Sequence, residues 1–168
     1  MIKYSYVLTN ENWIGNQYIH LAIFNPINSG RLVNIEKVIL NCGVIDDVYK
    51  ISALRGIRCN LINLINEIPK ATYGILSTYA PEPKAIITDG SSEIANGGDV
   101  FAIPGVGAFT REGITQGPQY EFFSKDGPMV LQEGEGLAIM EDASVGSNSY
   151  FNLMIYWDEI MGMKRYQD

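Results

Sequence analysis

Hydrophobic and polar residues alternate with a period of two along most of this chain. The clearest alternation lies in residues 149–158. One face of this segment carries Phe151, Leu153, Ile155 and Trp157. Successive side chains of a strand point to opposite faces, so the pattern predicts a strand with one face in a core. Trp157 is therefore expected to point inward.

Residues 18–24 are apolar on both faces, which is typical of a strand between two layers. Residues 25–30 are rich in the residue types that favour turns, and the apolar pattern resumes at 32–40. Residues 18–40 are therefore predicted to form a hairpin. Further strands are expected at 2–8, 49–58, 72–77, 84–88, 100–103, 120–123, 129–132 and 137–141. Many short strands with frequent turns predict an all-β sandwich or barrel.

One segment resists the strand interpretation. Helix-like spacing relates Leu61, Leu64, Ile65 and Ile68, and Asn60 precedes them as a possible cap. Pro69 would end such a helix at once, so one short helix and an irregular crossover both stay open. Seven glycines between Gly90 and Gly117 indicate long loops. No linker or repeat interrupts the chain, and residues 1–168 are expected to form a single β-sandwich domain.

Charge and composition narrow the function. The chain has 12 Lys and Arg against 19 Asp and Glu, a net charge of −7, and no basic run longer than Lys164-Arg165. This balance argues against nucleic-acid binding. The hydrophobic share of 46% predicts a folded chain. No apolar run approaches the ~18 residues that span a bilayer, and the N-terminus lacks a signal-peptide core. We expect a soluble protein made in a cytoplasm.

Cysteine and histidine offer little chemistry. Neither Cys42 nor Cys59 has a further ligand at zinc-binding spacing, so both are expected to be buried free thiols, with a bridge between them left open. His20 is the only histidine and lies in an alternating run, which favours a strand residue over a general base. No serine lies in a Gly-x-Ser-x-Gly elbow, so a hydrolase triad is disfavoured.

The remaining motifs also favour structural roles. Gly105-Val106-Gly107 opens like a dinucleotide fingerprint, but Thr110 replaces the third glycine. Gly134 is expected in a tight turn with positive φ. The acidic groupings are Asp46-Asp47, Glu133 with Glu135, Glu141-Asp142 and Asp158-Glu159. Adjacent acids on a strand point to opposite faces, which favours a solvated surface over a catalytic pair. We expect no catalytic residue, cofactor or metal, with calcium a lesser alternative.

Three aromatic residues near the N-terminus are candidates for an interaction. Trp13 lies in a polar stretch with few apolar neighbours to bury it. Tyr4 and Tyr6 share a strand face, which packs either on a neighbouring subunit or on its own domain. Residues 1–16 are therefore predicted to include an interaction arm. A sugar-binding platform would use the same residue types.

Two stretches carry a family resemblance. The first is the strand at 18–24, the turn Asn25-Pro-Ile-Asn-Ser-Gly30 and the strand at 33–39. The second is residues 130–139 with their Gly-Glu-Gly-Leu turn, followed by the closing strand at 150–159. Together they resemble jelly-roll virion structural proteins of tailed bacteriophages, although Glu133 stands where proline is more usual. The resemblance implies a jelly-roll-like antiparallel β-sandwich.

The resemblance also implies a function. Such proteins decorate or cement capsids, form head fibres or spikes, or build tail parts, commonly as trimers without catalysis. The chain is thus predicted to be a non-enzymatic virion protein that binds itself, as a homotrimer, and other virion proteins such as the major capsid protein. A carbohydrate- or receptor-binding β-sandwich module is the alternative. A cupin-like or other glycan-acting sandwich enzyme ranks third, because cupin metal sites usually need several histidines.

Overall fold

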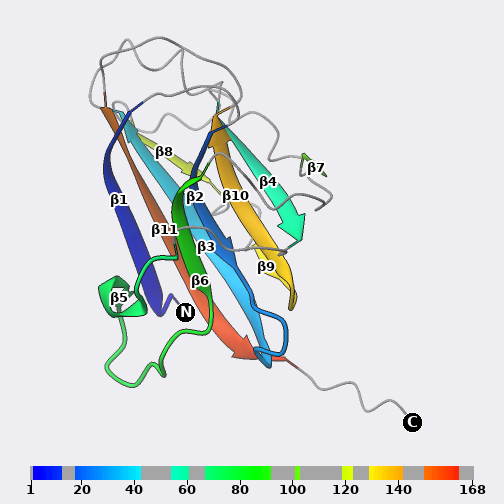
Figure 1. Ribbon diagram of the computed structural model, residues 1–168. Helices are drawn as coiled ribbons and strands as arrows, with labels where there is room; N and C mark the ends of the chain where they lie inside the picture. Colours follow the sequence, from blue (N-terminus) through cyan, green and yellow to red (C-terminus); the bar gives the residue numbers. More distant parts are fainter. Residues whose placement is uncertain are drawn as a thin grey trace.

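Two antiparallel sheets form the molecule (Figure 1). The computed structural model describes residues 2–12, 18–42, 54–60, 67–91, 101–102, 119–122, 129–141 and 150–162. Sheet A contains β1 (Tyr4–Asn12), β3 (Arg31–Cys42), β5 (Gly74–Ile75), β8 (Gln119–Phe122), β9 (Met129–Leu131) and β11 (Tyr150–Met161). Sheet B contains β2 (Ile19–Phe24), β4 (Leu54–Asn60), β6 (Ile86–Ser91), β7 (Phe101–Ala102) and β10 (Glu135–Glu141). This confirms the prediction of an all-β sandwich.

The strand pairing is nested. In sheet A the order is β5-β1-β11-β3-β8, with β9 also beside β3, and in sheet B it is β6-β2-β10-β4-β7. The first strand therefore pairs with the last, β2 with β10, β3 with β8 and β4 with β7. Strands β5 and β6 extend the two sheets at their edges. Nested pairing between two sheets is the order of a jelly roll.

The predicted hairpin over residues 18–40 is wrong. Strand β2 lies in sheet B between β6 and β10, whereas β3 lies in sheet A beside β11. The turn at 25–30 therefore carries the chain from one layer to the other. Alternation records which face of a strand is buried, and that pattern is the same for a hairpin and for a crossover between sheets. The burial of β2 on both faces is confirmed.

The other predicted strands all overlap an observed strand. Of the predicted helix face, Leu61, Leu64 and Ile65 lie outside the described residues, and the next element is the short 3-10 turn Lys70–Thr72. Cys42 and Cys59 lie on β3 and β4, but their side chains also lie outside what is described. Within the described ranges, no helix has the length and apolar character to cross a bilayer.

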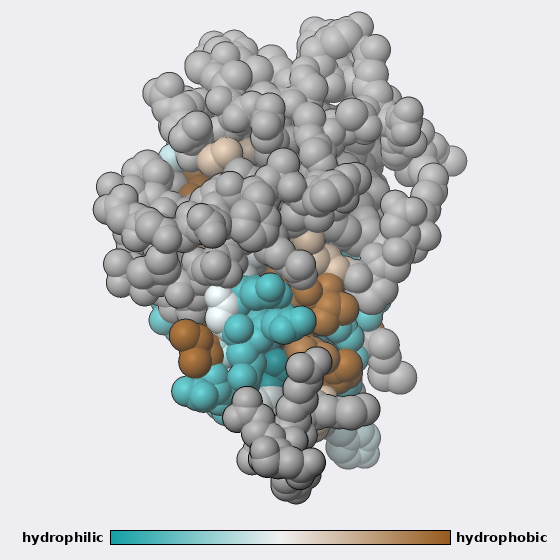
Figure 2. Space-filling view, turned by 90° about the vertical axis from the view of Figure 1, so that its right-hand side faces the viewer, coloured by the Kyte–Doolittle hydropathy of each residue, from teal (hydrophilic) through white to brown (hydrophobic). Residues whose placement is uncertain are grey.

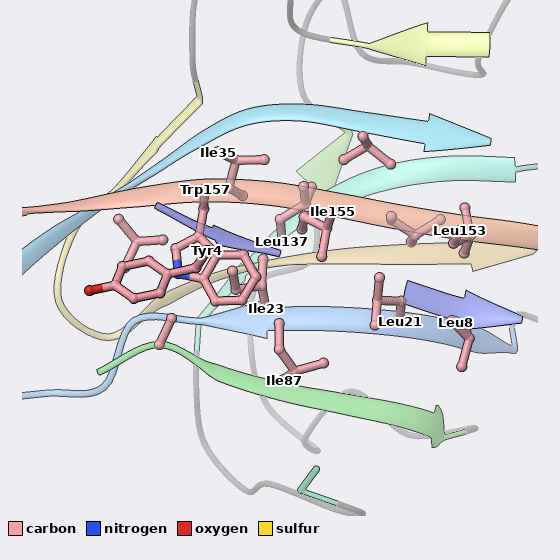
Figure 3. Close-up of a cluster of buried hydrophobic side chains, with 14 of the residues drawn as sticks. Tyr4, Leu8, Leu21, Ile23, Ile35, Ile87, Leu137, Leu153, Ile155 and Trp157 are labelled. Atoms are coloured by element: carbon pink, nitrogen blue, oxygen red, sulfur yellow. The ribbon is translucent and has the colours of Figure 1, made fainter. Parts of the chain in front are cut away.

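The core lies between the sheets and draws on both of them (Figure 3). Sheet B contributes Leu21, Ile23, Ile87 and Leu137, and sheet A contributes Tyr4, Leu8, Ile35, Leu153, Ile155 and Trp157. The Tyr4 ring stacks on Trp157 with the ring centroids 5.6 Å apart, and the Tyr73 ring meets Trp157 edge-on at 5.7 Å. Trp157 is fully buried, as its alternation predicted.

A second apolar cluster belongs to sheet B alone. It contains Ile19, Ala22 and Phe24 of β2 and Ala138 of β10, with the partly buried Met140 against it. Leu21 and Ile23 belong to the core between the sheets, so this cluster occupies the opposite face of sheet B. Its four central residues are buried, which means that the apolar side chains on this outer face are already covered.

Candidate functional site

Of the three aromatic residues that the sequence singled out, the structure describes Tyr4 and Tyr6. Tyr4 is buried in the core, and its hydroxyl donates a 2.8 Å hydrogen bond to the carbonyl oxygen of Pro81. Tyr6 is partly buried, with its ring edge-on to Tyr73 at 6.0 Å. Both tyrosines thus pack on their own domain, which is one of the two alternatives that the sequence left open. Trp13 lies outside the described residues.

The N-terminal segment is part of the sandwich over most of its length. Residues 4–12 form β1, which pairs along β11 from Tyr4 to Asn12 and with β5 at Tyr4 and Ser5. A strand with neighbours on both sides contributes to the fold itself. Residues 4–12 are therefore a strand of sheet A, and the interaction arm expected within residues 1–16 stays a prediction.

Two β-bulges bring the half-buried Glu11 and the fully buried His20 together between the sheets. The β1 register shifts between Leu8 and Glu11, where Asn10 has a φ of 57°, and the β2 register shifts at His20. A bulge re-aims the side chains beside it. Here the imidazole Nδ1–H of His20 donates to Glu11 Oε2 across 2.9 Å. His20 is fully buried, so the expectation of a strand residue holds for its position, while this pairing was not predicted.

Further polar groups lie near this pair: Tyr6 on β1, Asp89 on β6 and Tyr18 just before β2. Burial raises the pKa of Asp89, and the Glu11 charge raises it further. Burial also raises the pKa values of Tyr6 and Tyr18, and both carboxylates add to the effect. The Tyr18 and Phe151 rings lie edge-on to His20, with centroids 4.9 and 4.8 Å away. No local spacing signalled this cluster, because its members are brought together by two register shifts.

We expect Asp89→Asn to stabilise the protein at neutral pH. Burial raises the pKa of Asp89 in the fold above its ordinary value of 3.8, so the folded state retains this proton to higher pH than the unfolded state. The free energy of unfolding therefore falls as pH rises from about 3.8 through the raised pKa of the folded state. Above that pKa the buried carboxylate is ionised and its cost is greatest. The asparagine variant does not have this loss. Thermal unfolding followed by circular dichroism from pH 3 to 8 measures the difference.

The control for this prediction is Glu82→Gln, which neutralises an exposed carboxylate. It should leave the pH profile of the melting temperature nearly parallel to wild type. A lower melting temperature of Asp89→Asn at pH 7, or a profile parallel to wild type, would contradict the assignment of this cost to Asp89.

The acidic pair Asp158-Glu159 is buried, which corrects the expectation of a solvated surface. The two side chains do point to opposite faces. Asp158 binds the Lys3 ammonium at 2.9 Å, while the Glu159 carboxylate accepts hydrogen bonds from the backbone N–H groups of Lys84 and Ala85 and from Trp157 Nε1. Buried carboxylates persist where donors satisfy them. Strand alternation gives direction, but it cannot show that a neighbouring segment supplies the donors.

The two stretches that carried the family resemblance meet at one end of the sandwich. The Asn25 amide donates to the carbonyl oxygens of Arg31 and Leu131 at 2.8 and 3.1 Å, and the Gly134 N–H donates to the Asn25 carbonyl at 2.7 Å. Glu133, the departure from proline, accepts a 2.6 Å hydrogen bond from the N–H of Gly30. Gly134 has a φ of 82°, which confirms its predicted turn conformation. These contacts tie the two turns together as a cap at one end of the sandwich.

The outer face of sheet A carries exposed apolar side chains. Val33 and Leu131 point into the core, so by alternation Leu32 on β3 and Val130 on β9 point outward. We define the sheet A face as the outward side chains Val7, Leu32, Val130, Met154, Tyr156 and Ile160, which lie on four neighbouring strands. Val7, Ile160 and Val130 are 47%, 41% and 38% exposed.

Polar side chains on the outer side of sheet A include the half-buried Lys3 and Lys37 and the buried Asp158. Lys3 is paired with Asp158, and the Lys37 ammonium lies 4.9 Å from the centre of the Tyr156 ring. On the side of the molecule that is at the right in Figure 1, hydrophobic side chains lie beside hydrophilic ones among the described residues (Figure 2). Such a mixture of aliphatic, aromatic and paired charged groups is common in protein interfaces.

Among the described residues, no group of three or more His, Cys, Asp and Glu side chains is placed to hold a metal ion. In the Glu11–His20 pair of that part of the chain, the carboxylate contacts an imidazole that is fully buried. No family model, curated protein or solved structure matches this chain.

Proposed function

We propose that this chain is a non-enzymatic structural protein of a tailed-bacteriophage virion, a capsid decoration or cement protein or a head-fibre component. The observation that carries the proposal is the nested jelly-roll strand order. The residue patterns that resemble jelly-roll virion proteins form the cap at one end of this fold, around Asn25 and Gly134. The exposed apolar side chains of the sheet A face add a surface suited to assembly.

Assembly rather than catalysis suits what the described side chains offer. The acidic and imidazole groups described inside the sandwich connect its two sheets by hydrogen bonds. Glu11 pairs with His20, and Glu159 accepts from the segment before β6. A catalytic acid or base needs access to a substrate. The proposed partners are further copies of this chain, as a homotrimer, and other virion proteins such as the major capsid protein. The proposed location is the virion.

The proposal is tested on virions of the phage that carries the gene. Quantitative mass spectrometry of purified particles should find this chain at a fixed copy number per particle. Purified chain added to particles that lack it should co-sediment with them to saturation. A chain that is absent from purified virions and does not co-sediment with the particles would contradict the proposal.

A carbohydrate- or receptor-binding module is a second candidate, favoured by one observation. Tyr79 is 95% exposed in the segment that follows β5, which also contains the exposed Leu76. Tyrosine rings that project into solvent are typical of surfaces that stack on a partner. Glycan-array binding that is lost in Tyr79→Ala but kept in Tyr156→Ala would favour this function. No binding to any glycan by the wild-type chain would dispose of it.

A further inference from the structure

We propose that the Glu11–His20 pair is an acid-sensitive latch between the two sheets. It closes one end of the sandwich while the Glu11 carboxylate is charged, and it releases that end when acid neutralises the carboxylate. Both residues belong to one chain, so the latch acts whether or not the chain assembles and goes beyond the proposed function.

Glu11 points into the sandwich because β1 departs from regular strand geometry. In a regular strand, the side chains of residues 8 and 11 would lie on opposite faces. The bulge between Leu8 and Glu11, with Asn10 at a φ of 57°, instead places Glu11 opposite the core residue Phe151. A non-glycine residue at positive φ is strained and persists where the surrounding structure holds it. The strained backbone of β1 therefore directs an acid inward.

His20 meets this acid from the other sheet. The register of β2 with β10 shifts at His20, which makes it the extra residue of a second bulge. Its side chain is fully buried, and its Nδ1 lies 2.9 Å from Glu11 Oε2. The ring of Phe151 on β11, which carries no charge, lies edge-on to the imidazole at 4.8 Å. Because β1 belongs to sheet A and β2 to sheet B, the contact ties the two layers together.

The two ends of the sandwich are closed by different kinds of contact. Where β2 leads into β3, the Asn25 amide and the Gly134 N–H donate to carbonyl oxygens, and these groups do not titrate. The carboxylate of Glu133 adds one hydrogen bond to this cap. At the opposite end, where β1 and β6 end and β2 begins, Glu11 and His20 join the sheets through a titratable pair. Acid is therefore expected to act on one end and to spare the other.

The titratable groups near the pair, among the described residues, are Tyr6 on β1, Tyr18 before β2 and Asp89 on β6. Burial raises the pKa values of both tyrosines, so they stay neutral in acid. Burial and then the Glu11 charge raise the pKa of Asp89, so this carboxyl takes up a proton at higher pH than an exposed aspartate. Glu11 then loses a like-charged neighbour.

Neutralising Glu11 itself releases the latch. The imidazole of His20 then faces an uncharged carboxyl, and the contact is no longer a charge-assisted hydrogen bond. An imidazole is positively charged in acid, and full burial keeps water from replacing the charge that Glu11 supplied. The tie between β1 and β2 therefore weakens while the neutral hydrogen bonds of the cap persist.

Hydrogen exchange of the full chain, followed by mass spectrometry at pH 7 and pH 3.5 and corrected for the intrinsic effect of pH, tests the latch. We define the latch segments as residues 8–12 and 18–22, and the cap segments as residues 24–31 and 131–136. In wild type, acid should lower the protection of the latch segments relative to the cap segments by about 10- to 100-fold, which corresponds to the loss of a hydrogen bond to a charged group.

Two variants with the same change in charge separate the latch from a general effect of acid. Glu11→Gln keeps the size of the side chain but cannot ionise, so its latch segments should be open already at pH 7 and lose little more at pH 3.5. Glu133→Gln is the matched control, because it removes a carboxylate at the cap. Each variant changes the net charge from −7 to −6, since −7 + 1 = −6. The control should protect the latch segments at pH 7 as wild type does.

Circular dichroism shows whether each variant is folded. If Glu11→Gln is unfolded, Glu11→Asp takes its place, because it keeps the charge and shortens the reach, and it should lower the protection of the latch segments at pH 7. Four outcomes would overturn the inference. They are wild-type latch segments that keep their protection in acid, latch and cap segments that lose it together, a Glu11 variant that exchanges like wild type at pH 7, and a control that opens the latch segments as far as the Glu11 variant.

Discussion

Trp157→Ala is expected to remove about 3–5 kcal/mol of unfolding free energy, among the largest effects of any single substitution in this chain. Trp157 is fully buried where the two sheets meet, and the rings of Tyr4 and Tyr73 pack on it. Truncation leaves a cavity that backbone strands on both sides cannot close. It also removes the hydrogen bond from Nε1 to Glu159.

Urea unfolding followed by circular dichroism measures this loss, with Tyr79→Ala as the matched control. Tyr79 is also a large aromatic residue, but it is 95% exposed, so its removal should change the unfolding free energy by less than about 0.5 kcal/mol. A Trp157→Ala variant that loses less than about 1 kcal/mol would show that the packing between the sheets is not organised around this ring.

Glu159→Ala is expected to cost about 3–5 kcal/mol, because a buried carboxylate and its three donors form one unit. Glu159 lies on β11 of sheet A, while Lys84 and Ala85 lead into β6 of sheet B. Their N–H groups lie 2.8 and 2.9 Å from the carboxylate oxygens. Without the carboxylate, buried N–H groups have no acceptor and one polar link between the sheets is lost.

Glu159→Gln separates charge from volume. The amide keeps one accepting oxygen and nearly the same size, but its NH₂ group cannot accept from the facing N–H donors. We expect the unfolding free energy of Glu159→Gln to lie between those of wild type and Glu159→Ala, as measured by the same urea titration. The exposed Glu82→Gln should be close to neutral. Equal stability of Glu159→Gln and wild type would mean that the negative charge is not needed to hold the 84–85 segment.

The positions of the strands could be predicted from the sequence because burial has a period of two. Phe151, Leu153, Ile155 and Trp157 all face the core, as their spacing required. Which strands pair is a different question, and residues 18–40 show why. The same alternation suits a hairpin and a crossover between sheets, and the outcome depends on the hydrogen bonds that Asn25 makes with β10 and with sheet A.

The polar contacts inside the sandwich could not be predicted for a related reason. Glu11 and His20 meet because each strand has one extra residue at a bulge, and a one-residue shift reverses the face of every later side chain. The burial of Glu159 could not be predicted either, because its hydrogen-bond donors come from a segment 75 residues away in sequence.

The measurement that tests the central claim most directly is the solution mass of the wild-type chain by light scattering over a concentration series. The account predicts a defined oligomer, a whole-number multiple of 18.6 kDa with three copies expected, that persists on dilution. A monomer of 18.6 kDa at every concentration would contradict the proposed homotrimer and shift support to the glycan- or receptor-binding module.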